Sequence, residues 1–322
     1  MDPQDPSLDL LLRGQAGVVA RSQLLAAGLD RTRLAREVRR SRLVEVHRGV
    51  YVDHTGEPTW VQRAWAAVLW AAPAALHGAS ALRAFEGPGR RGRDESVVEV
   101  LVERDRRLRA PEGVRVVRRA GFDAQVQWNL GPPRQRYDQA ALDVALAAGR
   151  DLDAVAALAD AVGSQRTTAL RMRTALADRP WVRRRWWLEQ VLTDVAQGTC
   201  SVLEREHLQR VERAHALPTG ERQVLARHAG RVCWRDVRYA AQSVVVELDG
   251  RLHHSSTLDR DRDLDRDLAA AGDGDLTLRL GWGQVVERPC ETARRLADVL
   301  RSRGWTGTLE ACGKCGAPDQ PG

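Results

Sequence analysis

The sequence contains almost no lysine. Of the 50 lysine and arginine residues in this chain of 322, only Lys314 is a lysine. A mechanism that needs an active-site lysine is therefore nearly excluded. Long apolar runs are also missing, because the longest, residues 64–76, has 13 residues and contains Pro73. A membrane-spanning helix needs about 20 such residues, so we expect no membrane partner.

The first residues, MDPQDPSLD, are acidic and do not have the profile of a signal peptide. We therefore expect a cytoplasmic protein whose five cysteines are reduced. A length of 322 residues exceeds one ordinary core of about 100–200 residues, so two or three domains are expected. A net charge of +7 favours an anionic partner, such as DNA.

Positive charge is concentrated in one stretch of the N-terminal region. Between Arg31 and Arg48, seven arginines stand against two glutamates. Just before this stretch, ARSQLLAAG has helical spacing and ends at Gly28, which is a good C-terminal stop. Asp30 can then cap a second helix from Arg31 to about Ser41. The pattern predicts two short helices joined by a tight turn.

Residues 43–52, LVEVHRGVYV, follow this second helix and predict a small β-hairpin with Gly49 near its bend. On the helix itself, Leu34 and Val38 share one face. Helix, turn, arginine-rich helix and hairpin together predict a winged helix-turn-helix, with the second helix in the recognition position. The alternative is a small helical domain with a solvated basic face. The predicted DNA contacts are Arg31, Arg33, Arg36, Arg39, Arg40 and Arg48.

The middle of the chain resembles a connector. Residues 59–86 form helices rich in alanine and tryptophan, in which Trp60, Trp65 and Trp70 are expected to pack rather than to stack on bases. SVVEVLVER and GVRVVRRA predict strands, and the chain from about 138 to 196 is predicted to be mostly helical. No catalytic constellation stands out in this region.

From Cys200 onward, the order α-β-β-β-α-β-α predicts a mixed sheet flanked by helices. A tight turn at Ala241 and Gln242 would place Asp236 and Glu247 directly opposite each other in a hairpin, with their Cβ atoms about 5 Å apart. Facing carboxylates repel each other, and more strongly beside a buried valine run. A bound divalent cation would remove that penalty.

Magnesium fits this position because it prefers oxygen ligands and completes its octahedron with water and substrate phosphate. We therefore predict that Mg²⁺, or Mn²⁺, binds Asp236 and Glu247. Glu204 and Asp249 are the natural additional acids, and His254, or its neighbour at position 253, would move protons near neutral pH. Alternatively, the spacing of the acids arises by chance and the aspartate at 249 belongs to an ordinary turn.

The segments SVLEREHLQRV, WRDVRY, VVVELDGRLHHS, DLDRDLAAAG and LRLGW occur in this order. Together they resemble a bacterial family of unknown function related to the very-short-patch-repair endonucleases, within the PD-(D/E)XK nuclease-like superfamily. The resemblance covers about residues 200–303. It implies that Asp236 is the motif aspartate, Glu247 the second acid and Glu204 the acid of the first helix, and it places His254 in the histidine-containing segment. Asp249 stands where many members of the superfamily have lysine, a departure shared with the repair-endonuclease branch.

The N-terminal half, particularly GVVARSQLLAAGLDRTRLAREVRRSRLVEVHRGVYV and the later HGASAL, is similar to the antitoxin of AbiEi-type (type IV) toxin-antitoxin systems. This similarity covers roughly residues 5–90. It implies a winged-helix module that binds promoter DNA, and a cognate toxin as a further partner.

Two weaker patterns remain. Residues 258–268, LDRDRDLDRDL, predict a solvated helix, although Arg262 or Arg266, with Arg279 on the next strand, could instead contact a phosphate. Cys312 and Cys315 form a CxxC pair in a tail rich in glycine and proline. Zinc needs four ligands and no second CxxC follows, so we expect no complete zinc site within the chain.

These patterns predict a mixed, multidomain α+β chain. Its parts are a winged helix-turn-helix (1–56), a helical and strand-containing connector (57–198), a PD-(D/E)XK endonuclease-like α/β domain (199–305) and a flexible tail (306–322). The predicted activity is Mg²⁺-dependent hydrolysis of DNA phosphodiester bonds. The competing hypothesis is a transcriptional regulator or antitoxin without catalytic activity, in which the nuclease-like fold only binds DNA or a partner.

Overall fold

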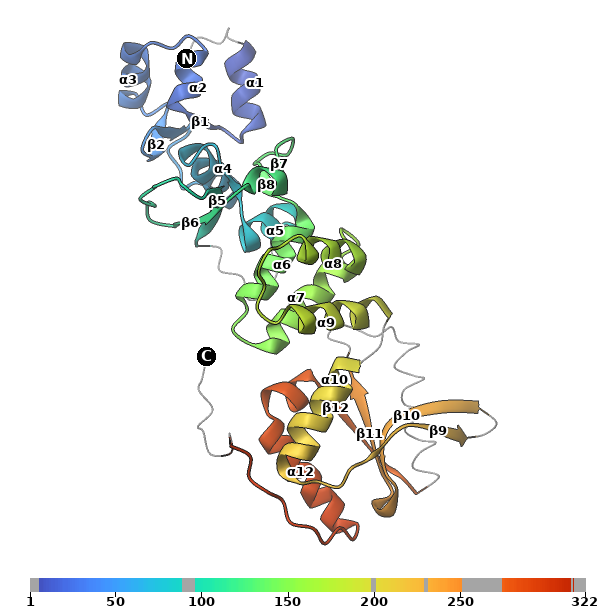
Figure 1. Cartoon of the computed structure of the whole chain (residues 1–322). Helices are drawn as coiled ribbons and strands as arrows, with labels where there is room; N and C mark the ends of the chain where they lie inside the picture. The colour runs from blue at the N-terminus through green and yellow to red at the C-terminus, as the bar shows by residue number, and fades with distance from the viewer. Residues whose placement is uncertain are drawn as a thin grey trace. The chain divides into compact units, whose positions relative to one another are not determined.

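The structure, a computed structural model, describes residues 6–88, 96–197, 201–228, 231–250, 274–313 and 315. It is a mixed α/β structure with helices and three sheets (Figure 1). The chain divides into two compact units, Met1–Leu146 and Ala147–Gly322. Among the described helices, none combines the length and the apolar character that crossing a bilayer requires.

The first unit begins with short helices and a small sheet. The helices are α1 (Pro6–Gly14), α2 (Arg21–Ala26) and α3 (Arg31–Arg39). The antiparallel strands are, in order across the sheet, β1 (Val18–Ala20), β3 (Val50–Val52) and β2 (Val44–His47). Oδ1 of Asp30 accepts the N–H of Arg33 at 2.6 Å, and Gly28 has a φ of +86°, which confirms the predicted cap and stop. A carboxylate oxygen of Glu45 accepts the N–H of Gly49 at 2.7 Å across the predicted hairpin.

The buried residues of α3 are Leu34 and Glu37. Leu34 is buried as expected, but Val38 is 37% exposed, whereas Glu37 is only 3% exposed and lies 3.6 Å from the guanidinium of Arg42. Successive helical residues are about 100° apart, so positions 37 and 38 lie on either side of Leu34. Leu34 and Val38 share one face as predicted, but the core lies on the side of Glu37.

Helix α4 (Trp60–Trp70) packs on the small sheet. Trp65 and Trp70 lie against a cluster that includes Val18, Val50 and Val52, which confirms their predicted packing role. The guanidinium of Arg83 lies 4.9 Å from the centre of the Trp60 ring.

A five-stranded sheet, in the order β6-β5-β4-β8-β7, completes the first unit. Its strands are β4 (Ala75–Leu76), β5 (Val98–Glu103), β6 (Val114–Arg119), β7 (Val126–Gln127) and β8 (Arg134–Gln135). Its helical segments are α5 (Gly78–Glu86), η1 (Phe122–Gln125) and α6 (Tyr137–Ala147), the last of which ends at the unit boundary. The two predicted strands of the connector are β5 and β6, which pair in parallel.

A buried polar network joins this sheet to α6. The imidazole of His77 lies between two carboxylates, with Nδ1 3.3 Å from Glu99 and Nε2 3.1 Å from Asp143. Gln135 and Arg119 also donate to Asp143, at 2.6 and 2.9 Å. Because its buried members are hydrogen-bonded to one another, this network stabilises the local packing.

The second unit begins with the helices α7 (Asp151–Gly163), α8 (Ala169–Ala177) and α9 (Arg185–Gln197), as predicted for this part of the chain. Ionic contacts join them to the C-terminal part. Arg210 lies 3.4 Å from Asp151, and Arg150 lies 3.7 Å from Glu287, whose carboxylate also accepts the N–H of Leu152. The last helices of the predicted connector therefore belong to the same compact unit as the C-terminal sheet.

The C-terminal part is built on a four-stranded sheet in the order β12-β11-β10-β9. The strands are β9 (Glu221–His228), β10 (Arg231–Tyr239), β11 (Val244–Asp249) and β12 (Leu276–Gly281). The first three pair antiparallel, and β12 is parallel to β11. The predicted order of elements is confirmed over the described residues, whereas the charged helix predicted at 258–268 lies outside them.

Helical segments pack beside this sheet. They are α10 (Ser201–Glu206), η2 (His207–Glu212) and η3 (Arg213–His215), which form one continuous run, and η5 (Gly283–Glu287) and α12 (Pro289–Ser302). Helix α12 contacts η2, and Figure 1 shows α10 and α12 side by side against the strands. Val244, Val245 and Val246 of β11 are completely buried, as the sequence predicted.

Candidate carboxylate site

The ladder between β10 and β11 sets the candidate site. Its pairs are Val237 with Val246, Arg238 with Val245, and Tyr239 with Val244. Continued by one residue on each strand, this register brings Asp236 of β10 opposite Glu247 of β11, the two residues that the sequence predicts to face each other. The connection is a 3-10 turn, η4 (Ala240–Gln242), followed by Ser243 with a φ of +50°. The turn is longer than the predicted two residues, but its centre is unchanged.

The outer strands β9 and β12 each place a polar residue beside Asp236 and Glu247, respectively. On β9, Arg222 pairs with Val237 and Val224 pairs with Arg235. Gln223, between them, therefore lies beside Asp236 of β10. On β12, Arg279 pairs with Glu247 in the parallel ladder. Residues directly opposite each other in a sheet share a face. A polar row of Gln223, Asp236, Glu247 and Arg279 therefore crosses the sheet.

Helix α10 adds a third carboxylate to this row. Nε2 of Gln223 donates to Oε1 of Glu204 at 2.8 Å. Gln223 has a φ of +51°, a conformation uncommon for residues other than glycine, so the strand deviates locally where its amide meets Glu204. Burial raises the pKa of Glu204, and the negative charge of Asp236 raises it further, against lowering by Gln223 and Arg222. Glu204 and Asp236 are thus close enough to repel each other.

The carboxylate of Asp236 is held at the end of β11. Its Oδ2 accepts the backbone N–H of Leu248 at 2.7 Å. Asp236 and Glu247 are both half-buried, and Asp249, two residues further along β11, is exposed. Residues two apart on a strand point to the same face, so Asp249 lies on the same face of the sheet as Glu247. The site is thus an open, acidic edge beside a buried valine run.

The described residues contain one group of three or more metal donors whose atoms all lie within 4.8 Å of one another. That group consists of His215, Cys290 and the CxxC pair, and not of the carboxylates. Magnesium often binds only one or two protein carboxylates and keeps several waters, so it does not need such a compact set. The oxygen-only donors of this edge, with like charges close together, fit a hard cation of that kind.

Several predicted site residues lie outside the described part of the chain. They are His254 with its neighbour His253, Arg262 and Arg266. Arg279 is described and lies in the polar row, on an exposed position of β12.

A second carboxylate network lies close to the first and was not predicted. Glu212, only 1% exposed, accepts a hydrogen bond from Arg222 at 2.6 Å and one from the hydroxyl of Tyr239 at 2.7 Å. Burial, with the nearby charge of Glu212, raises the pKa of Tyr239. Burial also lowers the pKa of His207 to about 3, so this imidazole is neutral at pH 7. Its Nδ1 lies 3.7 Å from Glu212, too far for a hydrogen bond.

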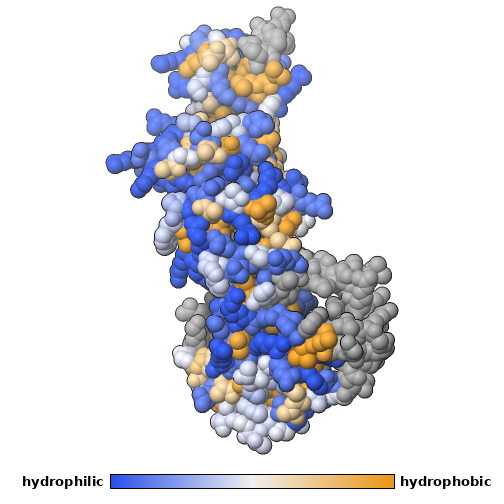
Figure 2. Space-filling model, turned by 45° about the vertical axis from the view of Figure 1, so that its right-hand side comes forward, coloured by the Kyte–Doolittle hydropathy of each residue, from blue (hydrophilic) through white to orange (hydrophobic). Residues whose placement is uncertain are grey.

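The arginines predicted to contact DNA lie on α3 and on the segment that follows it. Five are exposed and Arg33 is half-buried; the exposed ones are Arg31, Arg36, Arg39, Arg40 and Arg48. In the view of Figure 2, hydrophilic side chains cover most of the visible surface and apolar ones form smaller separate groups. The basic face of α3 is therefore presented to solvent.

Comparisons with known proteins give little further information. No family model matches the chain, and no curated protein matches it. Among solved structures, the chain is similar to the crystal structure of the RV2827C protein from Mycobacterium tuberculosis. The identity is 22%, the match covers 59% of this chain and 75% of that chain, and the TM-score is 0.39. Function therefore has to be argued from the residues of this chain.

Proposed function

We propose that this protein binds DNA and hydrolyses phosphodiester bonds with Mg²⁺ or Mn²⁺ held by Asp236 and Glu247. In this proposal the C-terminal part is a PD-(D/E)XK endonuclease-like domain and the N-terminal part is a winged helix-turn-helix. The observation that supports the proposal is the ladder register, whose continuation by one pair brings Asp236 opposite Glu247, with Glu204 close to Asp236.

The residues of the polar row have distinct tasks in this proposal. Asp236 and Glu247 would hold the cation, which when bound would polarise a substrate phosphate and activate a water. Glu204, with its raised pKa, would orient the attacking water and accept its proton, and Asp249 and His254 would assist. Arg279, next to Glu247 in the ladder, contacts the phosphate, and Arg262 or Arg266 is a further candidate for such a contact.

The N-terminal arginines would supply affinity for DNA. Exposed arginines on α3 and at Arg48 can neutralise phosphates, and binding of this kind weakens steeply as salt increases. The helix contacts would fix the position of the protein on the duplex, and the C-terminal site would carry out the cleavage.

Plasmid cleavage tests this proposal: supercoiled plasmid is incubated with the full chain and Mg²⁺ or Mn²⁺. Wild type should nick or linearise the plasmid, whereas Asp236→Ala and Glu247→Ala should leave it intact. Asp298→Asn, a change at an exposed acid of α12, is the matched control and should cleave normally. Duplex binding is measured in parallel at several salt concentrations.

The alternative is a non-catalytic regulator or antitoxin with a cognate toxin as partner. Asp249, at the position where many related nucleases have lysine, favours it. This alternative stands if wild type and both variants bind duplex with a steep salt dependence but leave the plasmid equally intact. If duplex binding is absent even at about 50 mM salt, the winged-helix assignment fails as well.

A further inference from the structure

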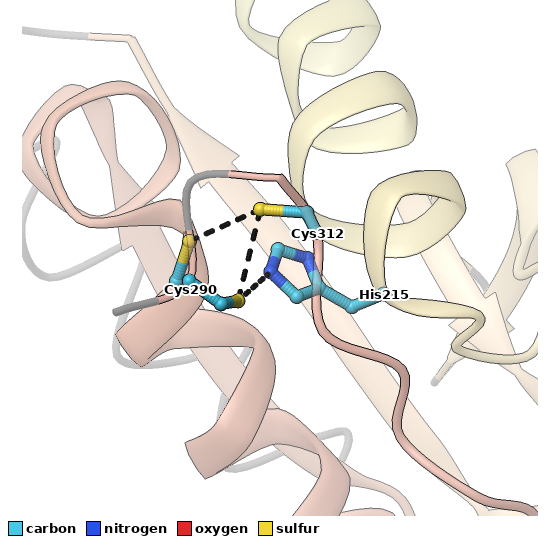
Figure 3. Close-up of side chains that lie close together, drawn as sticks. His215, Cys290 and Cys312 are labelled. Atoms are coloured by element: carbon cyan, nitrogen blue, oxygen red, sulfur yellow. Dashed lines mark hydrogen bonds between the residues drawn. The ribbon is translucent and has the colours of Figure 1, made fainter. Parts of the chain in front are cut away.

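Four metal-binding side chains from distant parts of the sequence meet in the second unit. His215 ends η3, Cys290 is the second residue of α12, and Cys312 and Cys315 follow that helix. Figure 3 shows His215, Cys290 and Cys312 turned toward one another, with ribbons of two different segments around them. All four donor atoms lie within 4.8 Å of one another.

Three of the six distances between the donor atoms match the edges of a tetrahedral site. Sγ of Cys312 lies 3.5 Å from Sγ of Cys290 and 3.7 Å from Sγ of Cys315, and the latter lies 3.4 Å from Nε2 of His215. Zinc bonds of about 2.3 Å to sulfur and about 2.0 Å to nitrogen give tetrahedral edges of about 3.8 Å between sulfurs and about 3.5 Å between sulfur and nitrogen. The three cysteines are free thiols and not disulfides.

The histidine is oriented for metal binding by its second ring nitrogen. Nδ1 of His215 lies 3.2 Å from the carbonyl oxygen of Val211. A carbonyl only accepts hydrogen bonds, so Nδ1 carries the proton and the lone pair of Nε2 faces the sulfurs. Metal-binding histidines are usually fixed in this way by a hydrogen bond from the other nitrogen. His215 is only 1% exposed, so water does not compete freely for Nε2.

Backbone hydrogen bonds, which do not depend on the thiols, bring the last described segment to this point. The N–H of Trp305 donates to Leu300, and the N–H of Glu310 donates to the carbonyl of His215 at 3.0 Å. The N–H of Cys315 then donates to Cys312 at 2.9 Å, which closes the CxxC turn. The predicted flexible tail is thus bonded to the body of the unit in its first part.

The length of the segment is consistent with this path. Helix α12, with 14 residues, is about 21 Å long. The ten residues from 303 to 312 reach up to about 33 Å when extended, enough to return from the end of α12 to its start.

We propose that His215, Cys290, Cys312 and Cys315 bind one Zn²⁺ as a structural site. Three thiolates and one imidazole in tetrahedral arrangement suit zinc, and four protein ligands leave no position open for a substrate. The ion joins the end of the helical run that carries Glu204 to the start of α12 and to the C-terminal segment. It is separate from the carboxylate row and does not depend on nuclease activity.

The first test measures metal in the full chain purified without chelators. We expect about one zinc per chain, and its loss in His215→Gln and in the double variant Cys312→Ser, Cys315→Ser. Cys200→Ser, which changes a cysteine outside the four donors, is the matched control and should keep the metal. Iron in place of zinc, or zinc retained by both variants, would overturn the proposal.

A second test needs no variant and therefore does not depend on how the variants fold. A thiol reagent is added to the native protein while released zinc is followed with a chromogenic chelator. Zinc release should rise together with modification of Cys290, Cys312 and Cys315, identified by mass spectrometry. Rapid modification of these thiols without zinc release, or a Cys290–Cys312 disulfide in protein kept under reducing conditions, would contradict the proposal.

Discussion

Glu204 and Glu212 lie on the same helical run, eight residues apart, and have opposite surroundings. Glu212 is almost completely buried, and Arg222 and Tyr239 donate to its two oxygens. Glu204 is half-buried and receives the amide of Gln223, while burial and the charge of Asp236 raise its pKa. The comparison shows that a buried acid with an arginine partner supports the fold, whereas an acid next to another acid is suited to bind a cation.

The largest effect should come from Asp236→Asn, which keeps the shape of the acidic edge and removes its charge. Loss of a metal ligand costs several kcal/mol of transition-state stabilisation, so we expect the plasmid cleavage rate to fall about 1000-fold. Affinity for duplex should change little. Cleavage within threefold of wild type would remove Asp236 from the proposed site.

Glu212→Gln tests whether Glu212, unlike Glu204, stabilises the fold. It leaves the half-buried guanidinium of Arg222 without its buried carboxylate partner, and breaking a buried pair costs about 3 kcal/mol or more. The free energy of unfolding in urea should fall by this amount. Glu204→Gln is the matched control and should cost much less, because it removes a charge that is already disfavoured. Equal losses for the two variants would contradict the contrast between them.

The network around Glu212 should also make stability depend on pH through His207. Its pKa in the folded state is about 3, below the ordinary value of 6.5, so the unfolded chain takes up a proton first as the pH falls. The stability from neutral His207 is complete above pH 6.5 and is lost as the pH falls toward 3. Between pH 6.5 and 5 the loss is about 2 kcal/mol.

Urea unfolding at pH 7, 6 and 5 measures this effect, with His207→Leu as the comparison. The variant should lose stability less steeply than wild type over this range. Parallel curves for the two proteins would show that His207 titrates normally.

The smallest effect is expected for a single arginine of the first unit. Arg36→Gln should weaken duplex binding by about 1 kcal/mol and reduce the salt slope by about one, because one phosphate contact is lost. Arg173→Gln, an equal charge change at an exposed position of α8, is the control. Fluorescence anisotropy at several salt concentrations distinguishes them. If both variants weaken binding equally, only net charge matters and α3 has no special role.

The sequence predicted the elements of the C-terminal sheet and the alignment of Asp236 with Glu247. That alignment was predictable because side chains alternate strictly along a strand, so the centre of a hairpin fixes every pair. Gln223 was not predicted as a partner of Glu204, because its contact depends on a positive φ that is uncommon for glutamine. The burial of Glu37 was not predicted, because helical spacing alone does not show which side of Leu34 meets the core.

The four proposed zinc ligands were not predicted from the sequence, for a different reason. The CxxC pattern indicates two of the ligands. His215 lies 100 positions from Cys315, so no local spacing pattern connects it to them. Single cysteines and histidines carry no spacing signal. Only the packing of α12 beside η2, with the returning segment after it, brings the four together.

The hydrogen bond from Glu310 to the carbonyl of His215 gives the end of the described chain a mechanical role. The segment 306–309 is a strap that joins Trp305, bonded to the end of α12, to Glu310, bonded to the end of the helical run on which Glu204 and Glu212 lie. A single proteolytic cut in this strap would separate Glu310 from the helix to which Trp305 is bonded.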